Sequence, residues 1–354
     1  MSNDIALSLP SLVSITPLYG LICDADKLQI DSEFWIEKFD PAVMLPFFAS
    51  ADEFLRSAST VQPEFLLWQR PPLDAPLLSD FLKPQYIEQF DGVYSSPAAI
   101  QTFFFEPCVN FFRQLRLFKS GRLRGGDTYV IVRWTHHEQE RWQSLASHRC
   151  TRMTLDPFVP LMTESTFSLN STDVASLNVL RDKVRPILES FNKEQPSLLR
   201  SLELALDLYA REDFGSMDVL NALTALEALL LHGSKTELTY RLSLRVAHLL
   251  GSDAASRKTL FNDIKEFYDL RSTIVHGNEL KAKHEAKFEQ MEELREIFRR
   301  TLLAMMALIA DGISKPELES LLDEIVLDEG KRRAVQEKAS AFPFAEETPV
   351  KMLQ

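Results

Sequence analysis

Apolar residues recur at intervals of three and four between residues 173 and 312, which is the spacing that places them on one face of an α-helix. Short breaks divide this region into consecutive segments, as expected for an all-α bundle. The expected helices cover residues 174–191, with a bend or restart near Pro186, and then 196–211, 217–231, 238–250, 260–276 and 280–310. Ser216 is expected to cap the third helix, and Gly251 and Gly277 to follow the fourth and fifth.

The first 155 residues carry shorter and more mixed patterns. The stretches "EFLLWQR" (64–70) and "TYVIVRW" (128–134) are typical of strands, and "LRGGD" (123–127) is typical of a hairpin turn before the second strand. Prolines interrupt any long helix there, at positions 63, 71, 72, 76 and 84. The predicted fold class is therefore an α+β N-terminal domain with an antiparallel sheet, followed by an all-α helical bundle.

Domain boundaries follow from the same patterns. Residues 1–155 are expected to form the mixed α+β domain, and residues 156–172 a linker, because "DPFVPLMTESTFSLNST" has two prolines, several hydroxyl residues and no helical period. The bundle is expected at 173–312. Residues 313–354 are expected to form a C-terminal helix and a tail that frays after Asp328, where the sequence is charged and then contains proline and glutamate.

The composition indicates a soluble protein. The 354 residues include 39 Lys and Arg against 51 Asp and Glu, a net charge of −12 that opposes unspecific adhesion to nucleic acid or anionic membranes. The three cysteines are far apart, so neither a disulfide framework nor a metal site is indicated, and no cofactor is expected. The N-terminus lacks a basic segment, and the apolar run "LLAMMALIA" is too short to span a membrane. We expect a cytoplasmic protein.

The stretch "FYDLRSTIVHGNEL" (267–280) places an arginine inside an apolar helix. An apolar stripe is formed by Leu260, Ile264, Phe267, Ile274 and Val275. At about 100° per residue, Arg271 lies near the middle of that stripe and is expected to point inward. A buried guanidinium requires an anionic partner. The expected partner is Glu227, which lies along the apolar face of "VLNALTALEALLL" (219–231).

His276 follows Arg271 by five residues and so lies about 140° around the helix from it. Either the helix ends at His276, as Gly277 indicates, or a second copy of the chain contributes to a shared pocket. The helix dipole favours a protonated histidine in the last turn. These residues have a second interpretation, in which Arg271 and Glu227 are a buried ion pair that fixes helix packing and His276 only caps a helix.

Three segments together resemble the Apea-like branch of the HEPN superfamily: "DVLNALTALEALLL" (218–231), "ELTYRLSLRVAHLLG" (237–251) and "FYDLRSTIVHGN" (267–278), the last with the superfamily's Arg-x4-His signature. The resemblance implies a helical bundle that dimerises so that two signatures face one cleft and form a metal-independent endoribonuclease. It implies that Arg271 and His276 are the catalytic pair, supported by Ser272, Glu227 and Asn278; many members have Asn, Asp or His where this chain has Ser272. Such proteins are common in bacterial anti-phage and toxin-like systems.

The residue types suit that chemistry. Cleaving RNA without a metal requires a proton to leave the ribose 2′-hydroxyl and another to reach the leaving 5′-oxygen, which histidine can transfer near neutral pH. Arg271 would hold the scissile phosphate with its planar, permanently charged fork. The expected products are a 2′,3′-cyclic phosphate, or the 3′-phosphate derived from it, and a 5′-hydroxyl, and DNA should be refused.

RNA contacts are predicted in the bundle, because residues 231–300 hold 13 Lys and Arg against 11 Asp and Glu. Candidate phosphate contacts are Arg241, Arg245, Lys281, Lys283 and Lys287, with ordinary ion pairing on the helix surface as the alternative.

A second basic run, "RQLRLFKSGRLR" (113–124), has phenylalanines at positions 111, 112 and 118. It could stack bases, or its apolar residues could belong to the core. His136 and His137 would point to opposite faces of a strand, which argues against a metal site.

The sequence thus predicts a cytoplasmic, homodimeric HEPN-type endoribonuclease that cleaves RNA, with tRNA among the candidates. A phage-derived or host trigger is expected to act at the N-terminal domain. The alternative is a non-catalytic HEPN interaction or sensor module in which the Arg/His pair is structural.

Overall fold

The computed structural model describes residues 11–40, 63–71, 101–121, 123–136, 139–149, 167–191, 197–210, 216–231, 236–340 and 342. They belong to two compact units. The sheet unit comprises residues 1–112 and 121–178, and the helical unit comprises residues 113–120 and 179–354. The division therefore falls inside two helices, α6 (Glu106–Phe118) and α7 (Val174–Glu189). An α+β N-terminal region followed by helices is confirmed.

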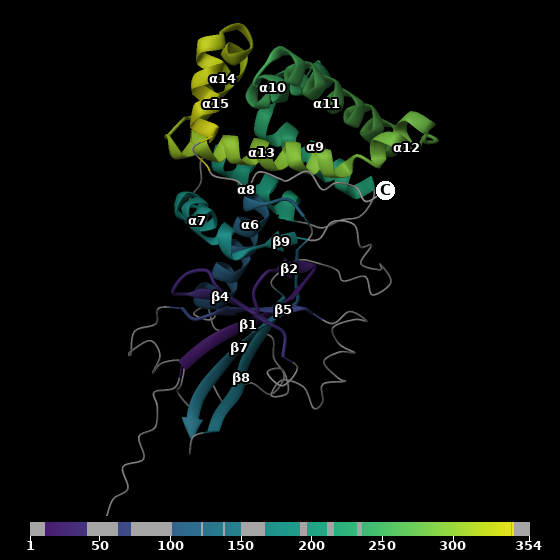
Figure 1. The fold of residues 1–354 in the computed structure, drawn as a ribbon. Coiled ribbons are helices and arrows are strands. Elements are labelled where there is room, and N and C mark those ends of the chain that lie inside the picture. Colours follow the sequence, from purple (N-terminus) through teal and green to yellow (C-terminus); the bar gives the residue numbers. More distant parts are fainter. Residues whose placement is uncertain are drawn as a thin grey trace, which may run out of the picture. The chain divides into compact units, whose positions relative to one another are not determined.

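The sheet unit is built on an antiparallel sheet, as expected (Figure 1). Its strands are β1 (Ser11–Tyr19), β3 (Lys27–Gln29), β4 (Phe34–Lys38), β5 (Phe65–Gln69), β6 (Arg124–Gly125), β7 (Asp127–His136) and β8 (Gln139–Arg149). The order is β3-β4-β5-β1-β7-β8, with β6 also paired to β1. Separately, β2 (Leu21–Cys23) and β9 (Phe167–Leu169) form a parallel pair. The two stretches predicted as strands are β5 and most of β7.

The "LRGGD" stretch is not the hairpin turn that its glycines indicate. It supplies β6, in which Gly125 pairs with Leu18 of β1. A Cβ atom at Gly125 would lie 2.5 Å from the Cζ atom of Phe112. The glycine therefore serves a close approach between strand and ring, which a local turn pattern does not reveal.

Both faces of β1 are buried. On one face Val13 and Ile15 join a cluster in which the rings of Trp35 and Trp68 stack 5.6 Å apart. On the other face the hydroxyl of Thr16 lies 2.6 Å from that of Thr128 and 3.3 Å from the Cys108 sulfur of α6. In addition, a π-helical turn, η2 (Gln101–Phe105), leads into α6. Residues 12–19 of β1 are therefore all buried, because α6 covers one face of the strand and the tryptophan cluster covers the other.

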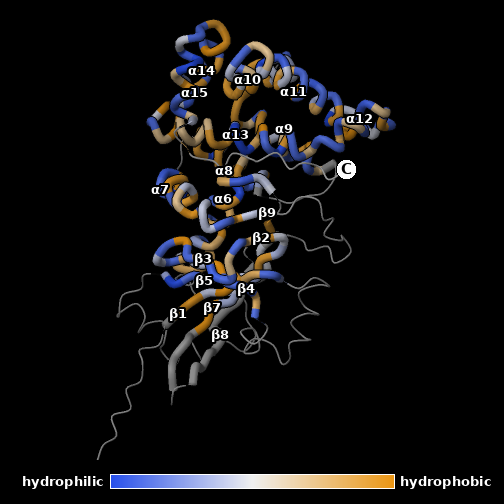
Figure 2. The backbone as a smooth tube through the Cα atoms, in the orientation of Figure 1, coloured by the Kyte–Doolittle hydropathy of each residue, from blue (hydrophilic) through white to orange (hydrophobic). Residues whose placement is uncertain are grey.

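The helical unit contains α8 (Ser197–Ala210), α9 (Ser216–Leu230), α10 (Leu238–Leu250), α11 (Ala254–Val275), α12 (Ala282–Phe288), α13 (Met291–Ala310), α14 (Lys315–Leu327) and α15 (Glu329–Ser340), with most of α7. The expected helices from 174 to 276 are confirmed, with ends shifted by one or two residues except that α11 begins at Ala254, six residues before the expected start at residue 260. Helix α13 packs against α8, α9, α10 and α15. Its second half is mostly apolar, and every residue from Thr301 to Leu308 is buried; much of this part of the helix is orange in Figure 2.

Two expectations about the C-terminal part were wrong. Residues 280–310 do not form one helix, because the chain turns at Glu289 and Gln290 between α12 and α13. The tail does not fray directly after Asp328, since residues 329–340 form α15. The carboxylate of Asp328 accepts hydrogen bonds from the first amides of α15, at Gly330 (2.8 Å) and Lys331 (3.1 Å), and Val335 is buried. A helix N-cap and one buried contact thus order a charged segment.

The expected linker is only partly covered by the structure. Residues 156–166 lie outside the described residues, while Phe167–Leu169 form β9 and Ser171–Asp173 form a single 3-10 turn, η3, before α7. In the tail, residue 341 and residues 343–354 also lie outside the described part.

The end of α6 is capped from the helical unit to which it belongs. Arg299 of α13, 1% exposed, donates from Nη1 to the carbonyl oxygens of Leu117 (2.9 Å) and Phe118 (3.2 Å). Tyr209 of α8 donates to the carbonyl of Arg116 at 3.1 Å. Carbonyls in the last turn of a helix lack partners within that helix, so these side chains satisfy them in the core.

Candidate functional site

Helix α11 ends at the Arg-x4-His signature in a Schellman motif. Gly277 has φ +63°, its amide donates to the carbonyl of Ile274 at 3.0 Å, and the amide of Asn278 donates to that of Thr273 at 3.0 Å. This is the left-handed glycine expected after the fifth helix. His276 is the C-cap residue, with φ −84° and ψ 1°. The glycine therefore fixes where the helix stops and leaves His276 at its end.

Arg271 lies at the edge of the buried face of α11 and not at its centre. The buried positions of this helix are Ile264, Phe267, Leu270 and Thr273, while Val275, expected in the apolar stripe, is 58% exposed. The prediction of an inward Arg271 therefore needs correction: its side chain is 26% exposed. The error arose because a stripe drawn through residues 264, 267 and 274 is offset from the face that α10 and α9 cover.

The expected partner of Arg271 is confirmed. Its Nη2 lies 3.6 Å from Oε2 of Glu227 on α9, whose side chain is 22% exposed. The hydroxyl of Tyr268 donates to the other oxygen of Glu227, Oε1, at 2.6 Å. The guanidinium also lies over the Tyr268 ring, 5.3 Å from its centroid. Sequence reasoning missed Tyr268, although its position three residues before Arg271 places the two on one helix face.

The surroundings of the Tyr268 hydroxyl shift its pKa. Burial, followed by the hydrogen bond to Glu227, raises the pKa of the Tyr268 hydroxyl to about 12, and the nearby Arg271 acts against that rise. Tyr268 therefore remains a neutral hydrogen-bond donor at physiological pH. Within the described part of the chain, the Nε atom of Arg271 is buried and has no hydrogen-bond partner.

His276, Ser272 and Asn278 are all exposed. The ion pair of Arg271 is made with Glu227, and His276 stands at the end of the same helix without sharing it. One chain thus presents the arginine on the side of α11 and the histidine at its tip. This is the arrangement that the angular spacing predicts for a helix ending at His276.

The two arginines of α10 expected to contact RNA both bind Asp323 of α14. Arg245 is 3% exposed, its Nη2 lies 2.6 Å from Oδ1 of Asp323, and its Nη1 donates to the carbonyl of Leu230. Arg241 is 36% exposed, with its Nη2 3.6 Å from Oδ2 of Asp323. Arg245 is therefore a core residue, and the prediction that it contacts RNA is wrong for this conformation.

The lysines after the signature differ among themselves. Lys283 is exposed and lies 2.6 Å from Oδ2 of Asp269, and the buried ring of His284 lies 3.1 Å from the same oxygen. Hydrogen bonds from these two side chains lower the pKa of Asp269. Lys287, in contrast, is 5% exposed and bonds to Asp263 at 2.8 Å, so it is not available to a ligand.

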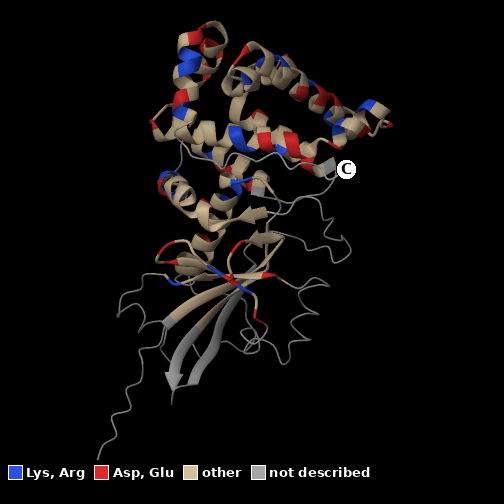
Figure 3. Ribbon diagram, viewed as in Figure 1, with Lys and Arg blue, Asp and Glu red and all other residues tan. Residues whose placement is uncertain are grey.

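Lys281 is exposed and forms the N-cap of α12. Lys281 and Lys283 thus remain accessible, while α12 is held against α11. Acidic and basic positions are interleaved along α11, α12 and α13, as Figure 3 shows. This mixture favours pairing within the surface over a single basic face.

The second basic run is mostly structural. Phe111, Phe112 and Phe118 are each at most 2% exposed, so these rings are core residues and do not stack on bases. Arg113 forms an ion pair with Asp207 at 2.5 Å. Arg122 lies outside the described residues.

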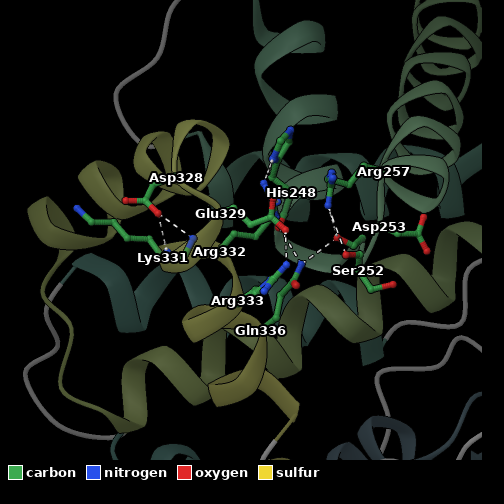
Figure 4. Close-up of polar contacts among 12 residues, drawn as sticks. His248, Ser252, Asp253, Arg257, Asp328, Glu329, Lys331, Arg332, Arg333 and Gln336 are labelled. Atoms are coloured by element: carbon green, nitrogen blue, oxygen red, sulfur yellow. Dashed lines mark hydrogen bonds and ion pairs between the residues drawn. The ribbon is translucent and has the colours of Figure 1, made fainter.

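The helices α14 and α15 dock at the corner between α10 and α11 (Figure 4). Gln336 donates to the carbonyls of His248 (3.1 Å) and Gly251 (3.0 Å), and Nη1 of Arg332 lies 3.3 Å from Nδ1 of His248. Arg257 donates to the carbonyl of Gly251 at 3.5 Å. Burial, and then the charges of Arg332 and Arg257, lower the pKa of His248. The sequence gave no signal for this contact, since the partners are more than 80 residues apart.

No group of three His, Cys, Asp or Glu side chains in the described ranges is arranged to hold a metal ion. His136 belongs to β7, while His137 and Cys150 lie outside the described residues. Cys23 and Cys108 are free thiols. Among the helices that the structure describes, none has both the length and the apolar character needed to cross a bilayer.

Comparisons with models of protein families, with curated proteins and with solved structures found no match. The resemblance to the HEPN superfamily therefore stays a prediction from the three sequence segments.

Proposed function

We propose that the helical unit is a HEPN-type, Apea-like, metal-independent endoribonuclease that acts as a homodimer in the cytoplasm. Arg271 binds the scissile phosphate, and His276 transfers protons between the ribose 2′-hydroxyl and the leaving 5′-oxygen. The observation that carries the proposal is the accessibility of both side chains: Arg271 is 26% exposed, and His276 is exposed at the end of α11. Ser272 and Asn278, the proposed supporting residues, are also exposed.

The polar character of the Arg271 contact supports the same function. An ion pair at 3.6 Å between side chains that are 26% and 22% exposed contributes on the order of 1 kcal/mol or less to folding. Such a small contribution to stability does not explain why an arginine stands at the margin of an apolar helix face. Phosphate binding gives a better one, because a guanidinium matches two phosphate oxygens at once.

Exposed apolar residues beside the signature support dimerisation. Val275 is 58% and Leu280 40% exposed, and they lie on either side of His276 in the sequence. In the proposed dimer these two side chains become part of the interface. A second copy of this unit that covers them would bring its own Arg271 and His276 to the same cleft, since a two-fold interface joins equivalent surfaces.

The test uses purified protein with total RNA, tRNA included, in the presence of EDTA. Wild type should cleave RNA to products with 2′,3′-cyclic phosphate or 3′-phosphate ends, and it should leave DNA of the same sequence intact. His276→Ala should lose on the order of 10²-fold or more of the rate, the usual contribution of a general acid or base. Arg271→Ala should lose at least as much. Arg333→Ala is the matched control, because it removes an exposed arginine of the same unit that has no proposed part in RNA binding. RNA left intact by wild type, or equal cutting by wild type and both variants, would contradict the proposal.

A second function is favoured by the contact between α9 and α11. The group formed by Glu227, Tyr268 and Arg271 joins the two helices, as a non-catalytic interaction module would require. In that case Arg271→Ala should destabilise the unit by about 3 kcal/mol or more, as loss of a buried pair does. The nuclease proposal expects about 1 kcal/mol or less. Urea unfolding of the variant distinguishes them.

A further inference from the structure

The two carboxylate oxygens of Glu227 have different neighbours. Its hydroxyl donates to Oε1 at 2.6 Å, which is a short hydrogen bond to a charged acceptor. The other oxygen, Oε2, lies 3.6 Å from Nη2 of Arg271. A full hydrogen bond between guanidinium and carboxylate has a donor–acceptor distance of about 2.7–2.9 Å. The carboxylate is therefore bound by the tyrosine and only neighbours the arginine.

Arg271 keeps hydrogen-bonding capacity in this arrangement. A guanidinium has five N–H donors, and a bidentate carboxylate would use two of them. Here the Nε atom is buried without a hydrogen-bond partner in the described part of the chain, and Nη2 is beyond hydrogen-bond distance of Glu227. The guanidinium carbon lies 5.3 Å from the centroid of the Tyr268 ring, a contact that does not require an N–H donor.

We propose that Tyr268 is a positioning residue that binds Glu227 and so keeps its carboxylate from closing on Arg271, leaving the guanidinium free to bind a phosphodiester oxygen of RNA. This inference rests on the proposed function, in which Arg271 is the phosphate ligand. It assigns two separate roles to Tyr268: the ring supports the guanidinium, and the hydroxyl binds the competing anion. Glu227 then sets the affinity of the site, since it is the anion that a phosphate must outcompete.

Two substitutions separate these roles. Tyr268→Phe keeps the ring and removes the hydroxyl, so Glu227 is free to form a bidentate pair with Arg271. Phosphate binding should weaken about tenfold, the effect of one additional charge-assisted hydrogen bond to the competitor. Glu227→Gln removes the competing charge and should bind phosphate at least as tightly as wild type. In the double variant the tyrosine has no carboxylate to bind, so its loss should have little effect, about twofold or less.

The experiment measures binding of a fluorescein-labelled 2′-O-methyl RNA oligonucleotide, which cannot be cleaved by 2′-hydroxyl attack, by fluorescence anisotropy in EDTA. The proteins are wild type, Tyr268→Phe, Glu227→Gln, the double variant and Arg271→Ala, each checked for folding by urea denaturation. A merely structural role for Tyr268 predicts that the double variant binds as weakly as Tyr268→Phe. Rescue by Glu227→Gln is expected only if the hydroxyl acts through the carboxylate.

Cleavage of the matching unmodified RNA is measured in parallel. If the variants bind RNA as predicted but neither wild type nor any variant cuts it, the nuclease proposal fails and the role of Tyr268 stands. If wild type cuts RNA while Tyr268→Phe binds like wild type, or the double variant shows no rescue, the role of Tyr268 is overturned and the nuclease stands. Binding that does not depend on Arg271 in wild type also overturns the inference.

Discussion

Arg241 and Arg245 offer a matched pair for testing how burial sets the value of an ion pair. They lie one turn apart on α10 and contact the same carboxylate, that of Asp323, yet Arg245 is 3% exposed and Arg241 36%. The perturbation is alanine at each position in turn. Because the two arginines share one helix and one partner, the difference between the two variants isolates the effect of the buried contacts.

The structure gives the magnitude for Arg245. Its Nε and Nη2 lie 3.2 and 2.6 Å from Oδ1 of Asp323, and its Nη1 caps the carbonyl of Leu230 at the end of α9. A hydrogen bond to a charged group contributes about 1.5–3 kcal/mol, and an unsatisfied buried carbonyl costs about 1–3 kcal/mol. Asp323 is 62% exposed and regains water, so no buried charge is left behind. We expect Arg245→Ala to lower the free energy of unfolding by about 3 kcal/mol.

Arg241→Ala should cost about 0.5 kcal/mol, because its pair is long and exposed on both sides. The assay is urea unfolding followed by circular dichroism at 222 nm, with thermal melts as a second measure. For a unit of this size, a difference of about 3 kcal/mol corresponds to a melting temperature lower by about 6–12 °C. If Arg245→Ala proved no more destabilising than Arg241→Ala, the docking of α14 on α10 described above would be refuted.

Two further predictions concern the ends of helices. Gly277→Ala should destabilise the unit by about 1 kcal/mol, because φ +63° is unfavourable for a residue with a Cβ atom even where the space around it is open, and Gly277→Asn should cost less; urea unfolding of both variants measures the difference. In the folded state the pKa of His248 is lowered below its ordinary value of 6.5. The unfolded chain therefore binds a proton at a higher pH than the folded protein does. The stability that the neutral His248 contributes is fully present above pH 6.5 and is lost as the pH falls through the folded-state pKa. His248→Gln should therefore flatten the decline of unfolding free energy between pH 7 and pH 5. An unchanged slope would contradict the lowered pKa that partial burial and the nearby charges of Arg332 and Arg257 give this ring.

The helices were predictable because their apolar periodicity is long and regular. The bounds of α10 agree with the expected ones, and Gly277 correctly indicates the end of α11. The apolar pattern does not show which other helix will cover a given face. Arg245 reads as a surface residue of an amphipathic helix, and only the packing of α14, about 80 residues further on, makes it a core residue. Helix α15 was missed for a related reason: it is a charged segment ordered by an N-cap and by docking, and contributes little apolar surface of its own.

The site, too, was predictable only in part. The pairing of Arg271 with Glu227 followed from charge complementarity between two apolar helices. Tyr268 was overlooked because tyrosine at a half-buried position is usual, and nothing in the sequence shows that its hydroxyl shares the carboxylate. Arg271 was expected at the centre of the apolar stripe, but the buried face of α11 runs through Leu270 and Thr273 instead, because neighbouring helices and not the apolar pattern alone decide which face is covered.

The capping of α6 by Arg299 bears on how this protein can be dissected. A gene fragment that begins at residue 173 would encode the helices of the bundle but omit residues 113–120, whose carbonyl oxygens accept the hydrogen bonds of that arginine. The excised piece would enclose a permanent cation with part of its acceptors missing. The bundle is consequently discontinuous along the chain, and its autonomy depends on a short stretch borrowed from upstream.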